Sequence, residues 1–293
     1  MSTQLEPAAE STTSAPSRRR PRRAGRTTLM LGAIGVGLVA LMALVSLFWT
    51  PFDPVRVDPQ ARLLGPSWPH LLGTDNFGID TLSRLMIGAR TCLLVGVIAV
   101  ALAAVIGVPL GIVAAMSRHW LGELVMRACD LLYAFPALLL AILLAAAFGG
   151  STWTAMVAIG IATIPAFARV TRSAALSVMS SDFVAAARIS GTSNWQTAVR
   201  HVLPNVAPVV GVQASVAFGM AILAEAALSY LGLGTPPPTP TWGRMLRDAQ
   251  TQMFLDPLQP LWPGVAIAVA VLGFNLLGDG LRDLLDPRLK ELR

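Results

Sequence analysis

Charged residues are scarce in this chain, and their scarcity indicates its class. Only 13% of the 293 residues are charged and 54% are hydrophobic, whereas soluble domains average about 25% charged residues. Only Lys290 among the 22 basic residues is a lysine, and the arginines lie at the ends of apolar runs rather than along one face. We therefore expect a membrane protein and no binding to nucleic acid.

The sequence also lacks the groups that would carry out chemistry. It contains no Gly-x-x-x-x-Gly-Lys-Ser/Thr phosphate loop, no Gly-x-Ser-x-Gly and no His-Glu-x-x-His. Its three histidines, His70, His119 and His201, are scattered without metal-ligand spacing. Cys92 and Cys129 fall in apolar segments that we place at opposite membrane faces, so no disulfide is expected. We predict no catalytic residue, metal or cofactor in this chain.

Long apolar runs predict an all-α, polytopic membrane protein with about six transmembrane helices, because about 20 apolar residues cross a bilayer once. The predicted spans are Thr27–Trp49, Thr91–Ser117, Leu121–Gly150, Thr152–Ala168, Val206–Gly234 and Leu261–Gly278. An amphipathic helix is expected separately from about Asp80. In the second span, small residues recur every four positions and predict close packing of another helix; they are Ala99, Ala103, Gly107 and Gly111.

These runs divide the chain into three parts. Residues 1–27 are predicted to be a disordered, basic cytoplasmic tail. Residues 28–90 hold the first transmembrane helix and an extracytoplasmic segment, and residues 91–293 form the main transmembrane domain. A signal peptide is the rival interpretation of the first run, but no small-residue cleavage site precedes Pro51, which favours a retained span.

The arginines predict the orientation. With six spans and both termini inside, 16 of the 22 basic residues are cytoplasmic and six are outside, as the excess of positive charge in cytoplasmic loops requires. The six outside are Arg56, Arg62, Arg84, Arg90, Arg244 and Arg247. This orientation places the chain in the cell (inner) membrane with the polar segment 182–208 in the cytoplasm.

Residues 182–208 interrupt the apolar runs with two predicted short helices. Asp182 is a candidate N-cap for the first helix, and Gly191 is expected to end it. Ser193 and Gln196 have the spacing of a capping box for the second helix, and Pro204 is expected to stop it. Helices this short are not stable alone in water, so the segment must dock on something.

This segment resembles the Glu-Ala-Ala loop of the permease subunits of binding-protein-dependent ABC importers. That motif reads Glu-Ala-Ala, three residues, Gly, nine residues, Ile, any residue, Leu-Pro. Five residues match it: Ala186, Ala187, Gly191, Leu203 and Pro204. Two positions depart, since Ala185 replaces the glutamate and His201 stands in place of the isoleucine. The resemblance implies that the loop, including Asp182, forms the coupling helix that sits in a groove of a cytoplasmic ATPase.

Three other stretches resemble oligopeptide and dipeptide permeases: residues 72–90 (LGTDNFGIDTLSRLMIGAR), residues 223–246 and residues 278–290 (GDGLRDLLDPRLK). The resemblance implies the transmembrane domain of a type I ABC importer for peptides. It also implies as partners a homologous permease subunit in a heterodimer, ATPase subunits that bind ATP and Mg²⁺, an extracytoplasmic substrate-binding protein and membrane lipid. A carrier of nickel or of another small solute would share this architecture.

Two polar residues in the spans are candidates for the translocation path or its gate. Glu225 is ionisable, and an ionisable side chain in a span is a functional hypothesis by default; it could equally pair with the loop above. Asn275 lies near the inner end of the last span. An ion-coupled carrier using Glu225 and Asp130 is the alternative class, but the sequence shows no convincing internal repeat.

Arg127 and Asp130 have the spacing of a local ion pair, and Trp242 is expected to be an interfacial anchor.

Overall fold

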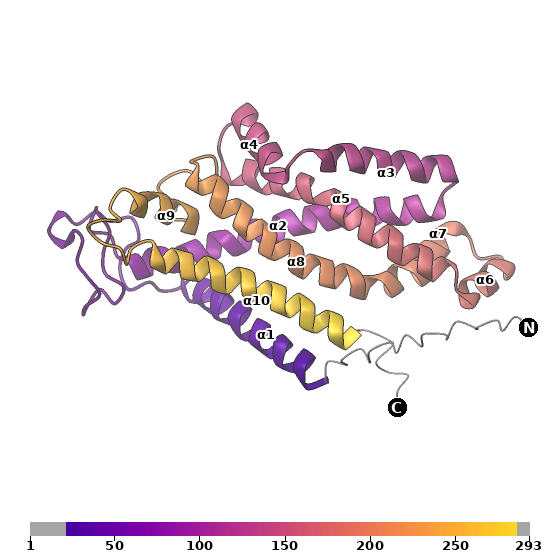
Figure 1. Ribbon diagram of the computed structural model, residues 1–293, viewed down its shortest axis with the longest axis horizontal. Coiled ribbons are helices and arrows are strands. Elements are labelled where there is room, and N and C mark those ends of the chain that lie inside the picture. Colours follow the sequence, from indigo (N-terminus) through magenta and orange to yellow (C-terminus); the bar gives the residue numbers. More distant parts are fainter. Residues whose placement is uncertain (1–21, 286–293) are drawn as a thin grey trace, which may run out of the picture.

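The computed structural model describes residues 22–285, and every regular element in this part of the chain is helical (Figure 1). The α-helices are α1 Arg22–Val45, α2 Thr81–Met116, α3 His119–Ala134, α4 Ala137–Phe148, α5 Thr152–Met179, α6 Asp182–Ile189, α7 Asn194–Thr197, α8 Leu203–Tyr230, α9 Trp242–Gln250 and α10 Leu261–Leu285. A short 3₁₀ turn, η1, covers Pro59–Ala61, and a π-helical turn, η2, covers Ala198–Val202.

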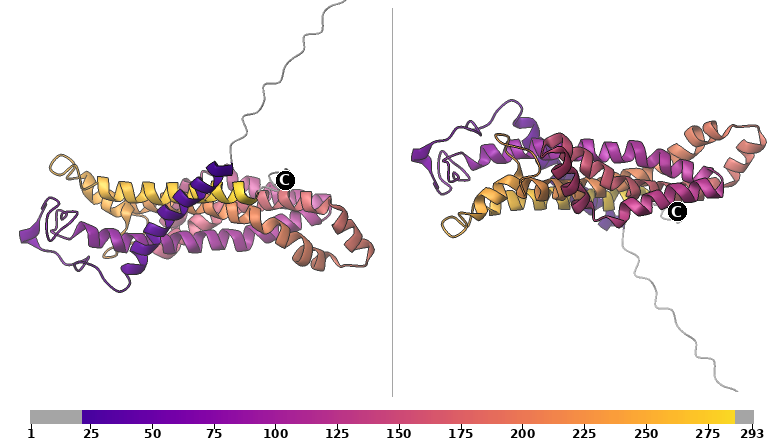
Figure 2. Two further views of the ribbon diagram at one scale, coloured as in Figure 1. Left: turned by 90° about the horizontal axis from the view of Figure 1, so that it is seen from below. Right: turned by 90° about the horizontal axis from the view of Figure 1, so that it is seen from above.

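The helices form an elongated bundle with two distinct ends. α6 and α7 lie at one end, which we call the α6/α7 end. α9 and the segment between α1 and α2 lie at the other, which we call the α9 end (Figure 1). Both views in Figure 2 show the same separation. The first turn of α1 and the last turn of α10 lie away from the α9 end (Figure 1).

Five helical stretches in the described chain are long and apolar enough to cross a membrane: Gly25–Val45, Thr81–Met116, Thr152–Met179, Asn194–Tyr230 and Leu261–Leu284. The pair α3 and α4 also passes this test if it is counted as one span, although the two helices are bent by 80° at their junction. The predicted all-α fold with about six spans is therefore confirmed.

The third predicted span is not a single rod. Pro136 lies at the junction of α3 and α4, and Phe135 before it is extended, with φ −82° and ψ 127°. A proline has no N–H for the helix and disfavours helical backbone in the preceding residue. The predicted Leu121–Gly150 span is therefore made of two helices, because this proline breaks it.

Other helices are longer than predicted. The amphipathic helix from Asp80 and the second span are one helix, α2, whose first turn is capped by the Asp80 side chain accepting from the Ser83 N–H at 2.8 Å. α5 continues through Pro165 to Met179 instead of ending near Ala168. α1 begins at Arg22, so residues 22–27 of the predicted disordered tail are helical. Residues 1–21 of that tail and the end of the 278–290 motif lie outside the described residues.

The small-residue stripe of α2 packs against α5, as the sequence predicts. A Cβ atom on Gly107 would lie 2.6 Å from the Phe167 Cβ, and one on Gly111 would lie 2.6 Å from the Ala168 carbonyl oxygen. Ala99 and Ala103 are buried in the same cluster. Only small side chains allow this close approach of the two helices, which forms the centre of the bundle.

Candidate functional site: the α6–α7 segment

α6 begins one residue away from the predicted cap. Ser181 is the N-cap residue, with extended backbone at φ −84° and ψ 148°, and Asp182 is the first helical residue. The prediction of Asp182 as the N-cap was therefore wrong. The Ser181 hydroxyl instead donates to the Val178 carbonyl at 2.5 Å. Asp182 in the first turn and Arg188 in the last turn still have the charges that complement the helix dipole.

Gly191 ends α6, as predicted. Its φ is +83°, in the left-handed region that favours glycine. The Gly191 N–H donates to the Arg188 carbonyl at 3.0 Å, and the Thr192 N–H donates to the Ala187 carbonyl at 3.1 Å. This pair of bonds defines a Schellman motif. Backbone hydrogen bonds therefore hold the turn between α6 and α7.

The capping box of α7 is also confirmed. The Gln196 N–H donates to the Ser193 hydroxyl at 3.3 Å, and the Ser193 N–H donates to the Gln196 side-chain oxygen at 3.2 Å. These reciprocal bonds satisfy two backbone donors that the start of a helix leaves free.

Pro204 does not stop the second helix, and that prediction was wrong. α7 continues through the π-helical turn η2 into α8, and Pro204 lies in the first turn of α8. The wider π turn just before it relieves the clash that a proline makes with the preceding helical turn. α7 is therefore the first turn of a helical stretch that runs from Asn194 to Tyr230, with no flexible joint between the loop and the span.

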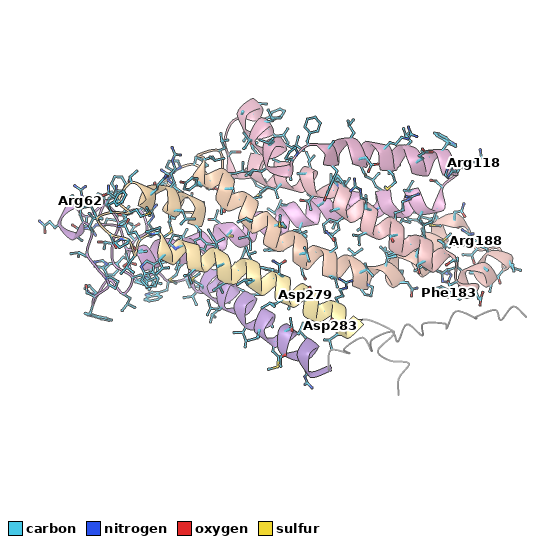
Figure 3. All side chains as sticks on the ribbon, viewed as in Figure 1. Arg62, Arg118, Phe183, Arg188, Asp279 and Asp283 are labelled. Carbon is cyan, nitrogen blue, oxygen red and sulfur yellow. The ribbon has the colours of Figure 1, made fainter. Side chains whose placement is uncertain are left out.

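All eight residues predicted for the coupling loop lie at the α6/α7 end, and none is fully buried. Six are exposed, whereas Ala187 and His201 are partly buried. The ring of His201 lies 6.2 Å from that of Phe183 in a tilted arrangement, which places the two ends of the segment beside each other. Figure 3 shows Phe183 and Arg188 at the extreme end of the molecule.

The structure adds an apolar surface that the motif did not include. Ile189 is 89% exposed, Trp195 is 76% exposed and Phe183 is 48% exposed. Val184, by contrast, is fully buried and anchors α6. The signal in the sequence was the presence of two large apolar residues, Phe183 and Ile189, in a segment that interrupts the apolar runs. Exposed apolar side chains on a protruding segment are typical of a surface that another protein covers.

Glu225 is buried within the bundle. Its side chain is fully buried, and its Oε1 accepts from the Ser229 hydroxyl, one turn further along α8, at 2.7 Å. Oε2 has no hydrogen-bond partner among the described residues. The alternative in which Glu225 pairs with the outer loop is not what the structure shows.

Asn275 is separate from Glu225. It lies on α10 beside Gly219, whose Cβ position would be 3.5 Å from the Asn275 Nδ2. Gly219 is about 9 Å of helix rise from Glu225 along α8, so the structure does not bring the two candidates into one polar cluster. Their role in a translocation path stays a prediction.

The charged residues of α3 pair differently from the prediction. Arg127 pairs with Glu123 at 2.5 Å, and Asp130 pairs with Arg169 of α5 at 2.7 Å. Arg169 also lies over the ring of Tyr133, 4.2 Å from its centroid. The sequence showed the local spacing of Arg127 and Asp130 but not the neighbouring helix, which supplies the partner for Asp130.

At the α9 end a buried polar network joins α9 to α2. Arg84 in α2 forms ion pairs with Asp75 of the preceding segment and, at 2.9 Å, with Asp248 of α9. The indole N–H of Trp242 donates to the Leu85 carbonyl at 2.9 Å, and its side chain is fully buried. The predicted interfacial position of Trp242 was therefore wrong, because the residue fills the junction between these helices.

The fold and this site define a class: a polytopic α-helical membrane protein with a protruding, rigidly held pair of short helices at one end. The profile of the family described as "Binding-protein-dependent transport system inner membrane component" matches residues 107–291. The chain belongs to this family.

Named relatives cover nearly the whole chain. It is 41% identical to the dipeptide transport system permease protein DppC of Alkalihalophilus pseudofirmus, over 89% of this chain and 86% of the relative. It is 41% identical to the glutathione transport system permease protein GsiD of Pectobacterium atrosepticum, over 88% and 87% of the two chains. The GsiD protein of an Escherichia coli O6:K15:H31 strain is 40% identical, over 89% and 86%.

Proposed function

We propose that this chain is the membrane-spanning permease subunit of an ATP-driven ABC importer that takes up small peptides. Its family supports the permease role. The names of the relatives, for dipeptide and glutathione transport, support a peptide substrate over nickel or another solute. ATP and Mg²⁺ are bound by a separate ATPase subunit, because this sequence lacks a phosphate loop.

The observation that carries the proposal is the continuity between the exposed α6–α7 segment and the spans. α7 passes through η2 into α8 as one helical stretch, and α6 follows α5 after only Ser180 and Ser181. A partner that moves this segment therefore moves two spans, because no flexible linker absorbs the displacement.

The mechanism follows from this continuity. Closure of the ATPase subunits on ATP would displace α6 and α7, and α5 and α8 would tilt as rigid bodies against a homologous permease subunit. A cavity between the two permeases would then alternate between the two sides of the membrane. This is a transition in which a docked element has two positions. Peptide would be delivered by an extracytoplasmic binding protein at the α9 end.

This mechanism requires the α6/α7 end and both termini to be cytoplasmic. The distribution of basic residues along the sequence supports that orientation. The structure supports it too: Arg118 and Arg188 lie at the α6/α7 end, and Arg62 lies at the opposite end (Figure 3).

Uptake by the reconstituted system tests the proposal. With the homologous permease, the ATPase subunits and the binding protein in proteoliposomes, we expect uptake of a labelled dipeptide that requires ATP and Mg²⁺. Dissipating the proton and sodium gradients should leave the rate unchanged. Uptake that follows an ion gradient and needs no ATPase subunit would contradict the proposal and favour the ion-coupled alternative.

A further inference from the structure

An apolar groove lies between the end of α2 and the start of the α7–α8 helical stretch. Its volume is about 420 Å³, within the range of pockets that hold small ligands. One wall belongs to a spanning helix and the other includes the proposed coupling helix α7. The lining residues are Val108, Pro109, Ile112, Val113, Met116, Ser117, Asn194, Trp195, Ala198, Val199 and Leu203.

The chemistry of the lining selects an apolar occupant. All the lining residues except Ser117 and Asn194 are apolar, and none is charged. Several remain open on the surface, Val113 being 45% and Val199 40% exposed. An open apolar groove of this kind normally marks a ligand or partner site.

Two arginines adjoin lining residues of the groove in the sequence. Arg118 directly follows Ser117, and Arg200 directly follows Val199; both are exposed. Neither forms an ion pair with a described residue. Two exposed arginines that adjoin lining residues of an apolar groove complement an anionic head group attached to an acyl chain.

We propose that this groove binds one anionic phospholipid of the cytoplasmic leaflet. The acyl chain lies along Val113 and Ala198, and the phosphate lies at Arg118 and Arg200. The placement in that leaflet rests on the orientation given under the proposed function. Anionic lipids are enriched in the cytoplasmic leaflet, and basic residues near its surface attract them. Because the two walls belong to α2 and to α7–α8, the bound lipid contacts both α2 and the helical stretch that the coupling movement displaces.

Lipid binding to the purified complex of this chain with its partner subunits tests the proposal. Native mass spectrometry would be recorded with added phosphatidylglycerol or phosphatidylcholine. Two interfacial arginines predict about a thirtyfold preference for phosphatidylglycerol. The R118Q/R200Q variant should lose that preference, while R56Q, an exposed arginine at the α9 end, should retain it.

A matched pair of substitutions on α2 tests the position of the acyl chain. V113W fills the groove and should reduce the retained phosphatidylglycerol at least tenfold. V105W enlarges a residue that is 72% exposed on the same helix but outside the groove, and it should retain the lipid.

Two results would overturn the proposal. One is equal retention of lipid by V113W and V105W. The other is efficient cross-linking of a cysteine at position 113 to the homologous permease or to the ATPase, which would show that protein covers the groove. Lipid retention is measured without transport, so equal retention by V113W and V105W in a complex that still shows ATP-driven uptake would refute this inference alone. Uptake without ATP would refute the proposed function instead.

Discussion

The substitution R84M is expected to destabilise the α9 end by roughly 3–5 kcal/mol, the usual cost of removing one partner from a buried ion pair. Arg84 is buried and is the partner of both Asp75 and Asp248. Asp75 is itself buried, and its Oδ1 already accepts from the backbone N–H groups of Phe77 and Ile79. Methionine would fill much of the space of the arginine but leave these carboxylates without a cation.

The free energy of unfolding in mixed detergent micelles, from a titration with a denaturing detergent, measures this loss. The triple variant R84M/D75N/D248N is the control, because removing the charges together with their partner should restore much of the stability. Equal stability of R84M and the wild type would show that the ion pairs do not hold α9 to α2. Similar losses in the single and triple variants would assign the effect to packing and not to charge.

The substitution G191V is expected to reduce ATP-driven uptake tenfold or more while leaving expression and membrane insertion unchanged. Gly191 has φ +83°, and no atom lies within 4 Å of its Cβ position. A side chain here would therefore meet no neighbour, and its cost is the strain of the left-handed backbone, about 1–2 kcal/mol or more. Relief of that strain requires another turn between α6 and α7, which would redirect α6 away from its partner.

Asparagine provides the matched control, because it tolerates the left-handed conformation better than other residues with a side chain. We expect G191N to retain substantially more uptake than G191V, with basal ATPase activity measured in parallel to detect uncoupling. Equal and normal uptake by both variants would show that the geometry of this turn does not matter for coupling.

Local signals in the sequence predicted local structure well. The capping box of Ser193 and Gln196 and the helix end at Gly191 depend only on neighbouring residues, and both are confirmed. The adjacent Ser181 and Asp182 show the limit of such signals, since both residue types are good N-caps and the backbone selects the first. The small residues Gly107 and Gly111 predicted a close helix contact correctly, although they could not identify α5 as the partner.

Four of the prolines show why the helix boundaries could not be predicted from sequence. Pro136 breaks a helix, whereas Pro109, Pro165 and Pro204 lie inside continuous helical stretches. A proline is accommodated in a spanning helix when neighbouring helices or a local π turn satisfy the freed backbone groups. That depends on tertiary neighbours, as do the burial of Trp242 and the pairing of Asp130 with Arg169.

The sequence predicted where the candidate site lies along the chain. It did not predict which side chains of the site are exposed. The motif residues identified the segment, whereas the exposure of Ile189 and Trp195 and the continuity of α7 with α8 required the structure. A residue's exposure on a short helix depends on the direction in which that helix leaves the bundle. Here the turns at Ser181 and Gly191 set that direction.

Site-directed cross-linking at Ile189 tests the central claim most directly, because this residue is 89% exposed on α6. In whole cells that express the complete transporter, we expect I189C to cross-link to the ATPase subunit. A membrane-impermeant thiol reagent added outside should leave it unlabelled. Cys92 and Cys129 are buried free cysteines and would be replaced by alanine in the parent and in the variant. Labelling of I189C from outside the cell, with no cross-link to the ATPase, would contradict the account.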